Sequence, residues 1–218
     1  MHFLSHSLLP MAVFLGLFWL PGVGHAERPM NVDDAGVGAA RTGFVQTWFA
    51  REPGGGRVWN VASTYVPLTG LEVTATLSRD RTDRLTTTGL EGKFQLTRPQ
   101  AGGCHHAAAL ELTHPRGQRG PASFSHGMMS CEVGRGAVHM NLGLFRAPGG
   151  PSLPTAGVAW ERAFGAVTGY VEWEVQRDEK PTLGMGFRTE LVKDIDLGAS
   201  VGRNGGETLY SIGVKFEF

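Results

Sequence analysis

Apolar and polar side chains alternate one by one through most of the chain from residue 41 onward. In LEVTATLS (71–78) the odd positions are apolar and the even positions polar, and VHMNLGLF (138–145), VEWEV (171–175) and IDLGASVG (195–202) repeat the pattern. Successive side chains of a β-strand point to opposite faces, so a period of two indicates strands with one apolar face. No convincing stretch with the 3.6-residue period of a helix follows the N-terminal region. The pattern predicts an all-β fold.

The number of alternating segments is even, and the connections between them are of two kinds. Connections after even-numbered segments are tight, such as GRG and FGA, whereas those after odd-numbered segments, such as EPGGG and RDRTDR, are longer or more polar. Outer-membrane barrels have short periplasmic turns and longer outer loops, with both chain ends in the periplasm. About twelve strands are expected, near residues 41–51, 56–66, 70–79, 84–97, 104–114, 121–133, 136–146, 154–164, 167–178, 181–192, 194–203 and 207–218.

The length and the second face of these strands separate a membrane barrel from a secreted β-sandwich. Each strand has about 10 residues available, enough for a tilted strand to cross a bilayer. Sandwich strands are usually shorter, and their sheets hide the apolar faces from water. A closed sheet with lipid outside explains charge opposite the apolar face. We therefore predict a transmembrane antiparallel β-barrel over residues 41–218, with these candidate lumen-lining residues: Glu72, Glu91, Lys93, Glu111, Glu161, Glu172, Glu174, Arg188, Glu190 and Lys215.

The first 26 residues have the pattern of a cleaved signal peptide. An apolar run ends at Pro21 and is followed by the small residues Gly24 and Ala26, after which cleavage is expected. The alternative is a retained membrane anchor, although the apolar run is short for a spanning helix. The pattern predicts export and, together with the barrel pattern, a location in the cell outer membrane.

Residues 27–40 form a polar, proline-bearing segment before the first predicted strand. Asp33 and Asp34 could pair with Arg188, Lys93 or Lys215 inside the lumen. A periplasmic tail is the alternative, and the sequence leaves both open.

Cys104 and Cys131 are the two cysteines of the sequence. In an oxidising compartment two cysteines favour one disulfide, with two free thiols as the alternative. Pairing them across the fifth and sixth predicted strands places the midpoint of the hairpin between Gly117 and Gln118, inside the expected loop HPRGQRG. Directly opposed residues of antiparallel strands lie close enough for such a bond.

The chain ends with ETLYSIGVKFEF, in which Tyr210, Phe216 and Phe218 share one apolar face. An alternating closing strand of this kind resembles the terminal signal that the barrel-assembly machinery recognises. We expect these three residues to act as that signal, and we expect outer-membrane lipid to surround the barrel.

The segment RPMNVDDAGVGAARTGFVQTWFAR (28–51) resembles bacterial outer-membrane proteins with an RPxxVDDA-type mature N-terminus. The similarity extends through GRVWNVASTYVPLTGLEV and VAWERAFG to the terminus. The resemblance implies an outer-membrane β-barrel of the kind described as a transporter or an uncharacterised membrane protein. It implies no catalytic residue.

The residues were searched for catalytic and metal-binding constellations. His126 and Ser125 are neighbours in a strand and point to opposite faces, which counts against that pair as base and nucleophile. A pair between strands, such as His114 with Ser123, stays open. His105 and His106 also diverge, so they are poorly placed to chelate one metal ion. We predict no metal site, no cofactor and no enzymatic activity, with an outer-membrane hydrolase as second alternative.

The function predicted from the sequence is a narrow channel or passive transporter for small solutes of unknown identity. The lumenal charges fit a selectivity lining or, alternatively, a salt-bridged filling of a non-conducting structural or surface-interaction barrel. The formal net charge is zero and only 18% of residues are charged. This balance gives no reason to expect a nucleic-acid partner.

Overall fold

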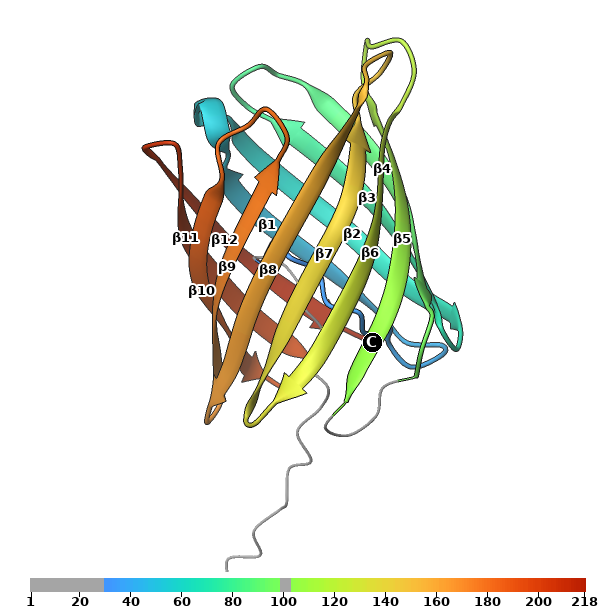
Figure 1. Cartoon of the computed structure of the whole chain (residues 1–218), viewed down its shortest axis with the longest axis vertical. Coiled ribbons are helices and arrows are strands. Elements are labelled where there is room, and N and C mark those ends of the chain that lie inside the picture. The colour runs from blue at the N-terminus through green and yellow to red at the C-terminus, as the bar shows by residue number, and fades with distance from the viewer. Residues whose placement is uncertain (1–29, 99–102) are drawn as a thin grey trace, which may run out of the picture.

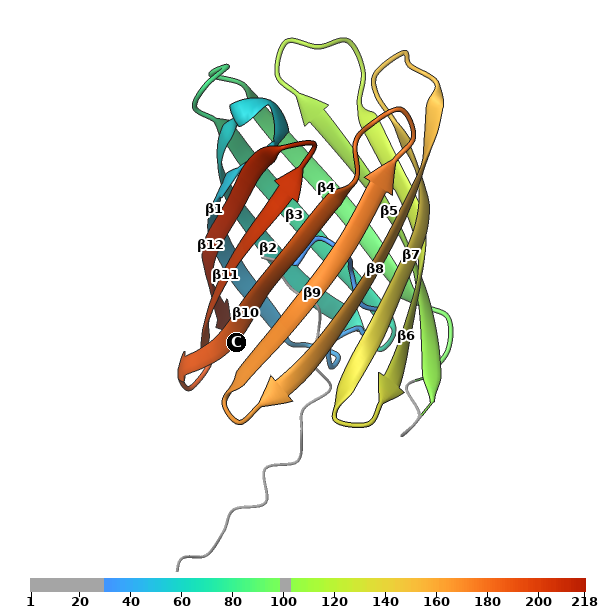
Figure 2. The same ribbon diagram turned by 60° about the vertical axis from the view of Figure 1, so that its left-hand side comes forward.

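The computed structural model describes residues 30–98 and 103–218. The predicted signal peptide and residues 27–29, including Arg28 and Pro29, lie outside the described residues. Twelve described strands form one closed antiparallel barrel, in which each strand pairs with its neighbours in the chain and β1 pairs with β12 (Figures 1 and 2). The strands are β1 Gly43–Arg51, β2 Arg57–Leu68, β3 Leu71–Asp80, β4 Thr86–Gln95, β5 Cys104–Pro115, β6 Ala122–Val133, β7 Gly136–Arg146, β8 Ser152–Phe164, β9 Val167–Gln176, β10 Thr182–Val192, β11 Ile195–Asn204 and β12 Glu207–Glu217.

The fold predicted from the alternation is confirmed. Each strand boundary lies within two residues of its expected position. The short helical turn η1 Pro53–Gly55 lies in the connection between β1 and β2. No helix of the described residues has the length and hydropathy needed to cross a membrane.

The two ends of the barrel differ in their connections. At one end, here called the turn end, residues 69–70, 134–135, 165–166 and 193–194 link consecutive strands. Gly70, Gly134 and Gly165 have positive φ there, which two-residue hairpin turns of this kind require. The opposite end, the loop end, carries connections 52–56, 81–85, 116–121, 147–151 and 177–181 and the short connection 205–206. In Figure 1 the loop end is at the top.

The outer surface of the barrel is apolar. Leu142 is 71% exposed and Leu183 is 61% exposed, and both lie on outward faces of their strands. Exposed aromatic residues lie toward both ends: Trp59, Trp173 and Tyr210 near the loop end and Tyr65, Phe94, Phe164, Phe216 and Phe218 near the turn end. An apolar band between two aromatic girdles is typical of barrels that cross a bilayer.

The seam between the first and last strands is fully paired. The register joins Phe44 to Glu217 and Arg51 to Tyr210. Beyond it, the Gly43 N–H donates to the Phe218 carbonyl oxygen and the Phe218 N–H donates to the Gly43 carbonyl oxygen, each at 2.9 Å. The sheet therefore has no free edge, which is what allows backbone to lie in lipid.

Candidate functional site: the barrel lumen

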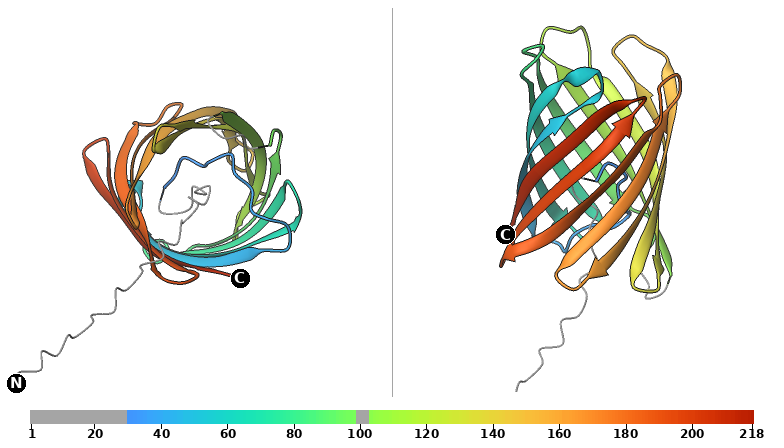
Figure 3. Two further views of the ribbon diagram at one scale, coloured as in Figure 1. Left: turned by 90° about the horizontal axis from the view of Figure 1, so that it is seen from below. Right: turned by 90° about the vertical axis from the view of Figure 1, so that its left-hand side faces the viewer.

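Residues 30–42, here called the lumenal segment, run inside the barrel before they join β1. Seen from the turn end, the segment lies within the ring of strands (Figure 3, left). Met30, Val32, Asp34 and Ala35 are each at most 2% exposed. A segment of this composition reaches such burial only when its polar groups find partners on the barrel wall.

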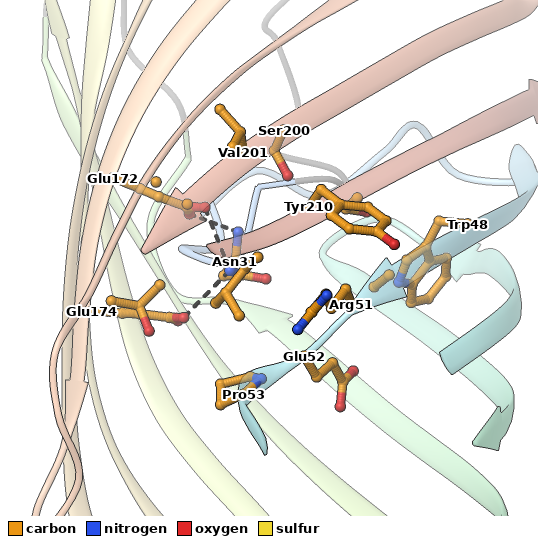
Figure 4. A pocket seen from close by; sticks show the side chains of 16 residues that line it. Asn31, Trp48, Arg51, Glu52, Pro53, Glu172, Glu174, Ser200, Val201 and Tyr210 are labelled. Carbon is orange, nitrogen blue, oxygen red and sulfur yellow. Dashed lines mark hydrogen bonds between the residues drawn. The ribbon is translucent and has the colours of Figure 1, made fainter. Parts of the chain in front are cut away.

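The first described residues of the lumenal segment are bound by β9. Glu172 Oε2 accepts hydrogen bonds from the backbone N–H groups of Asn31 at 2.7 Å and Val32 at 3.1 Å. The Asn31 side-chain amide donates to Glu174 Oε1 at 3.3 Å. Figure 4 shows Asn31 directed at these two carboxylates. A carboxylate bound by backbone N–H groups makes strong, charge-assisted hydrogen bonds.

Two aspartates of the segment contact basic side chains on the opposite wall. Asp34 Oδ1 lies 3.4 Å from Lys93 Nζ, and both side chains are almost fully buried. Asp33 Oδ2 lies 3.1 Å from His126 Nε2. A charge buried this deeply requires a partner, so the Asp34–Lys93 pair fixes where the segment can lie.

A chain of polar contacts links the segment to β6, β7, β8 and β10. Ser130 Oγ accepts a hydrogen bond from the Ala35 N–H at 2.8 Å and lies 2.8 Å from His139 Nδ1. His139 Nε2 lies 3.6 Å from Glu161 Oε1, and Glu161 Oε2 accepts a hydrogen bond from Arg188 at 2.5 Å. Buried polar networks of this kind favour one arrangement when their members are satisfied.

Apolar contacts complete the attachment. Met30 and Val32 cluster with Ala159 and Tyr170 of the wall. Ala35 clusters with Ala107, Ala109 and Met128 in the same way. The wall residues beneath the segment are small: a Cβ added at Gly157 would lie 2.9 Å from Val32 Cγ2. Small residues of the wall therefore leave the space that the lumenal segment occupies.

Open space remains around the segment. Three cavities of about 220, 320 and 320 Å³ each border Asn31, so the segment divides the lumen without filling it. The cavity between the segment and strands β1–β6 is lined by Asp33, Glu52, Glu72, Glu91, Glu111, Lys93 and His126, together with hydroxyl and amide side chains. Open space with a carboxylate-rich wall is suited to small polar molecules.

The ten charged residues predicted for the lumen fall into four groups in the structure. Glu72, Glu91, Lys93 and Glu111 line the cavity against β1–β6, and Glu172 and Glu174 border the smaller cavity on the other side of Asn31. Glu161 and Arg188 form an ion pair with each other. Lys215 contacts Asp196 at 2.7 Å and also Glu217, near the turn end. Glu190 is exposed there, beside the register shift between β10 and β11.

The sequence placed His126 and Ser125 on opposite faces of a strand and left a pair between His114 and Ser123 open. His126 lines the lumen, whereas Ser125 lies on the outward face of the same strand. Ser123 is opposite Leu112 in the register, two positions from His114. The structure instead joins Ser130 to His139, but each of these residues is only 2% exposed and Ser130 already binds Ala35.

The two histidines considered for metal binding diverge, as neighbours in a strand must. His105 is buried, and exposed His106 lies with Nδ1 3.3 Å from Thr97 Oγ1. Within residues 30–98 and 103–218, no group of three His, Cys, Asp or Glu side chains is arranged to hold a metal ion.

The two cysteines form a disulfide. Cys104 and Cys131 are directly opposed in the register of β5 and β6, with their Cα atoms 4.0 Å apart. The pairing expected from the hairpin geometry is confirmed.

Sequence reasoning did not assign a lumenal role to Ser130, His126 or Tyr170. Both faces of SFSHGMMS carry polar residues, so alternation gives a weak signal in β6. Tyr170 precedes VEWEV at the position that the alternation marks as inward, and this signal was available. Tyr170 is 3% exposed; its register partner on the neighbouring strand is Gly186, and it clusters with Met30 and Val32 of the lumenal segment.

No protein-family model and no curated protein matches the sequence. Solved structures do match the fold. A KdgM porin in complex with disordered oligogalacturonate superposes with a TM-score of 0.69 at 11% identity, covering 81% of this chain and 99% of that chain. A second KdgM porin structure gives a TM-score of 0.68 at 11% identity with the same coverage. A membrane protein from work on in-meso crystallization gives 0.56 at 8% identity, over 82% of this chain and 83% of that chain. The chain has the fold of a porin-like twelve-stranded barrel.

Proposed function

We propose that this protein is an outer-membrane barrel that passes small polar solutes through a lumen narrowed by residues 30–42. The observation that carries the proposal is the pair of opposite surfaces on one closed sheet. The outside is an apolar band with two aromatic girdles, and the inside is a polar wall with open cavities on both sides of the lumenal segment. The KdgM porins of the same fold support this function.

The proposed orientation places the loop end outside the cell and the turn end in the periplasm. The described lumenal segment joins β1 at the turn end, and β12 finishes there as well. Tyr210, Phe216 and Phe218 all lie on the outward apolar face, with exposures of 41%, 50% and 60%. This placement supports their proposed recognition by the barrel-assembly machinery.

The lining favours neutral or cationic solutes over anions. Carboxylates of Glu72, Glu91 and Glu111 face the cavity that Lys93 shares. Rings of Asp or Glu side chains select for cations in other channels. A polyanionic sugar, such as the oligogalacturonate bound by the KdgM porin, would meet repulsion along this wall.

Conductance in planar bilayers tests the channel. The full chain should give small current steps with a reversal potential that favours cations in a salt gradient. Deleting residues 30–37 should enlarge the steps, because the segment would no longer divide the lumen. The variant Glu91→Gln/Glu111→Gln should reduce cation preference while the step frequency stays constant. Silence of both the full chain and the deletion variant, in protein that is folded, would contradict a channel function.

A non-conducting barrel is the second candidate, and the burial of the lumenal segment favours it. Three sets of polar contacts and two apolar clusters hold the segment in place. If this candidate is right, the full chain gives no current in planar bilayers and only the variant that lacks residues 30–37 conducts. We propose a non-enzymatic role in either case, because Ser130 and His139 serve to hold the segment.

A further inference from the structure

Four arginines gather at the loop end of the barrel, away from the lumen. Arg57 is the first residue of β2, Arg79 lies near the end of β3, and Arg81 and Arg84 are in the connection that follows. All four are exposed. Arg57 and Arg79 lie on the outward faces of their strands, the same faces as Trp59 and Leu77. We call these four residues the arginine cluster.

Hydrogen bonds fix the backbone around the arginine cluster. The Arg81 N–H donates to the Arg57 carbonyl oxygen at 2.8 Å, and the Arg57 N–H donates to Thr82 Oγ1 at 3.2 Å. Asp80 Oδ1 accepts hydrogen bonds from the backbone N–H groups of Thr82 at 2.6 Å and Asp83 at 3.2 Å. These bonds fix the connection 81–85 and join it to the start of β2, so the arginines lie on a defined backbone.

Two adjoining surface hollows lie between the arginine side chains. One, of about 510 Å³, is lined by Trp59, Arg79, Arg81 and Arg84. The other, of about 590 Å³, is lined by Phe49, Gly55, Arg57, Arg81 and Thr82. Arg81 belongs to both. Within the described residues no carboxylate lies in ion-pair contact with any of the four arginines, although Asp80 and Asp83 are nearby in sequence.

The chemistry of the hollows has two parts. Guanidinium groups bind phosphate oxygens with paired hydrogen bonds. The hollows also have aromatic walls, Trp59 at 47% exposure and Phe49, and they lie directly beside the exposed apolar band that continues through Leu77. A ligand that binds both the arginines and the apolar walls has a phosphorylated headgroup and hydrocarbon chains.

We propose that the arginine cluster binds the phosphorylated headgroup of a lipid in the outer leaflet, with its acyl chains against Trp59 and Leu77. The proposal rests on the membrane orientation given above. Clusters of basic residues at a membrane surface bind anionic headgroups, with each residue adding about fivefold in affinity. Lipids with a phosphorylated headgroup are therefore bound in preference to other lipids on this side of the barrel, beside β2 and β3.

Native mass spectrometry of the full mature chain in neutral detergent provides the test. The probe is diphosphoryl lipid A, compared with the same lipid after enzymatic removal of its phosphates. The test variant is Arg79→Gln/Arg81→Gln. The matched control is Arg116→Gln/Arg119→Gln, which removes the same charge from two exposed arginines of the next loop-end connection. A third variant, Arg81→Gln/Arg84→Gln, changes only loop residues.

The full chain should retain diphosphoryl lipid A, and the two cluster variants should bind it about tenfold or more weakly. The control should bind as the full chain does. Equal retention of the dephosphorylated lipid, an equal loss in the control, or full displacement by inorganic pyrophosphate alone would each overturn the proposal. All variants should keep the heat-dependent gel shift of a folded barrel; its absence in the unsubstituted chain would count against the membrane assignment itself.

Discussion

Gly186 shows how a missing side chain positions a buried one. Tyr170 faces Gly186 in the register of β9 and β10. A Cβ at Gly186 would lie 2.6 Å from Tyr170 Cζ and 2.5 Å from the Ala199 carbonyl oxygen. Real Cβ atoms do not approach other atoms so closely, so a substitution at Gly186 must shift Tyr170, which clusters with Met30 and Val32, or the backbone of the neighbouring strand.

Gly186→Ala should therefore destabilise the barrel by about 1–3 kcal/mol, the usual cost of overpacking. The temperature at which the heat-dependent gel shift occurs measures the effect. Gly127→Ala is the matched control, because a Cβ there meets no heavy atom of the described residues within 4 Å. Equal transition temperatures for the two variants would contradict the packing argument.

The buried Asp34–Lys93 pair makes a second prediction at the residue scale. Lys93→Met leaves the Asp34 carboxylate buried without its partner, which typically costs about 3–5 kcal/mol. The lumenal segment should leave its position, and the conductance should approach that of the chain lacking residues 30–37.

The double variant Asp34→Asn/Lys93→Met separates the charge from the packing. It removes both charges together and should return the conductance most of the way to that of the full chain. If the single and double variants conduct alike, the ion pair is not what holds the segment.

Residue-scale reasoning from the sequence identified the faces of the strands and missed the partners. Alternation predicts an inward position for Glu172, because a period of two depends only on neighbours in the chain, and in the structure Glu172 borders a cavity. It could not show that Glu172 binds Asn31, 141 residues earlier. Pairings over such distances depend on closure of the whole barrel.

At the scale of the elements, the disulfide of the β5–β6 hairpin can be tested. The Cys104–Cys131 bond joins directly opposed residues at the turn end. The hydrogen-bond ladder of the two strands already constrains this hairpin. Loss of the bond should therefore cost less than the roughly 3–3.5 kcal/mol of a chain-entropy estimate.

Cys104→Ser/Cys131→Ser should keep the barrel and loosen its turn end near these two positions. Hydrogen exchange of β5 and β6 backbone amides measures the loosening. Alkylation of unreduced, denatured protein from the envelope provides an independent check. Labelling of both thiols would show that the bond does not form in the cell.

The strands were predictable from the sequence and the course of the lumenal segment was not. Most of the strands alternate clearly, because one face of each meets an apolar surrounding and the other faces polar space; β6 is the weak case. The stretch MNVDDAG is polar enough for either a periplasmic tail or a lumenal position. Its place depends on contacts with β4, β6 and β9, none of which leaves a local pattern.

For the whole molecule, the orientation in the membrane can be tested directly. An epitope tag inserted after Gln118, at the loop end, should bind antibody on intact cells. A tag after Arg135, at the turn end, should bind antibody only after the outer membrane is permeabilised. Both positions lie in connections, so neither insertion interrupts a strand. The reverse labelling would invert the proposed topology.

The contacts of the lumenal segment also imply an order of events in time. The segment comes before every strand, yet its partners Lys93, Ser130 and Glu172 come 59, 95 and 141 residues after the positions they hold. Contacts this distant in sequence form late, because each requires the intervening chain to be in place. The part of this barrel that precedes all the strands is thus among the last to settle. The pairing of β1 with β12 joins residues still farther apart in sequence, such as Phe44 and Glu217, so we expect closure of the barrel and placement of the segment to be late steps of the same stage of assembly.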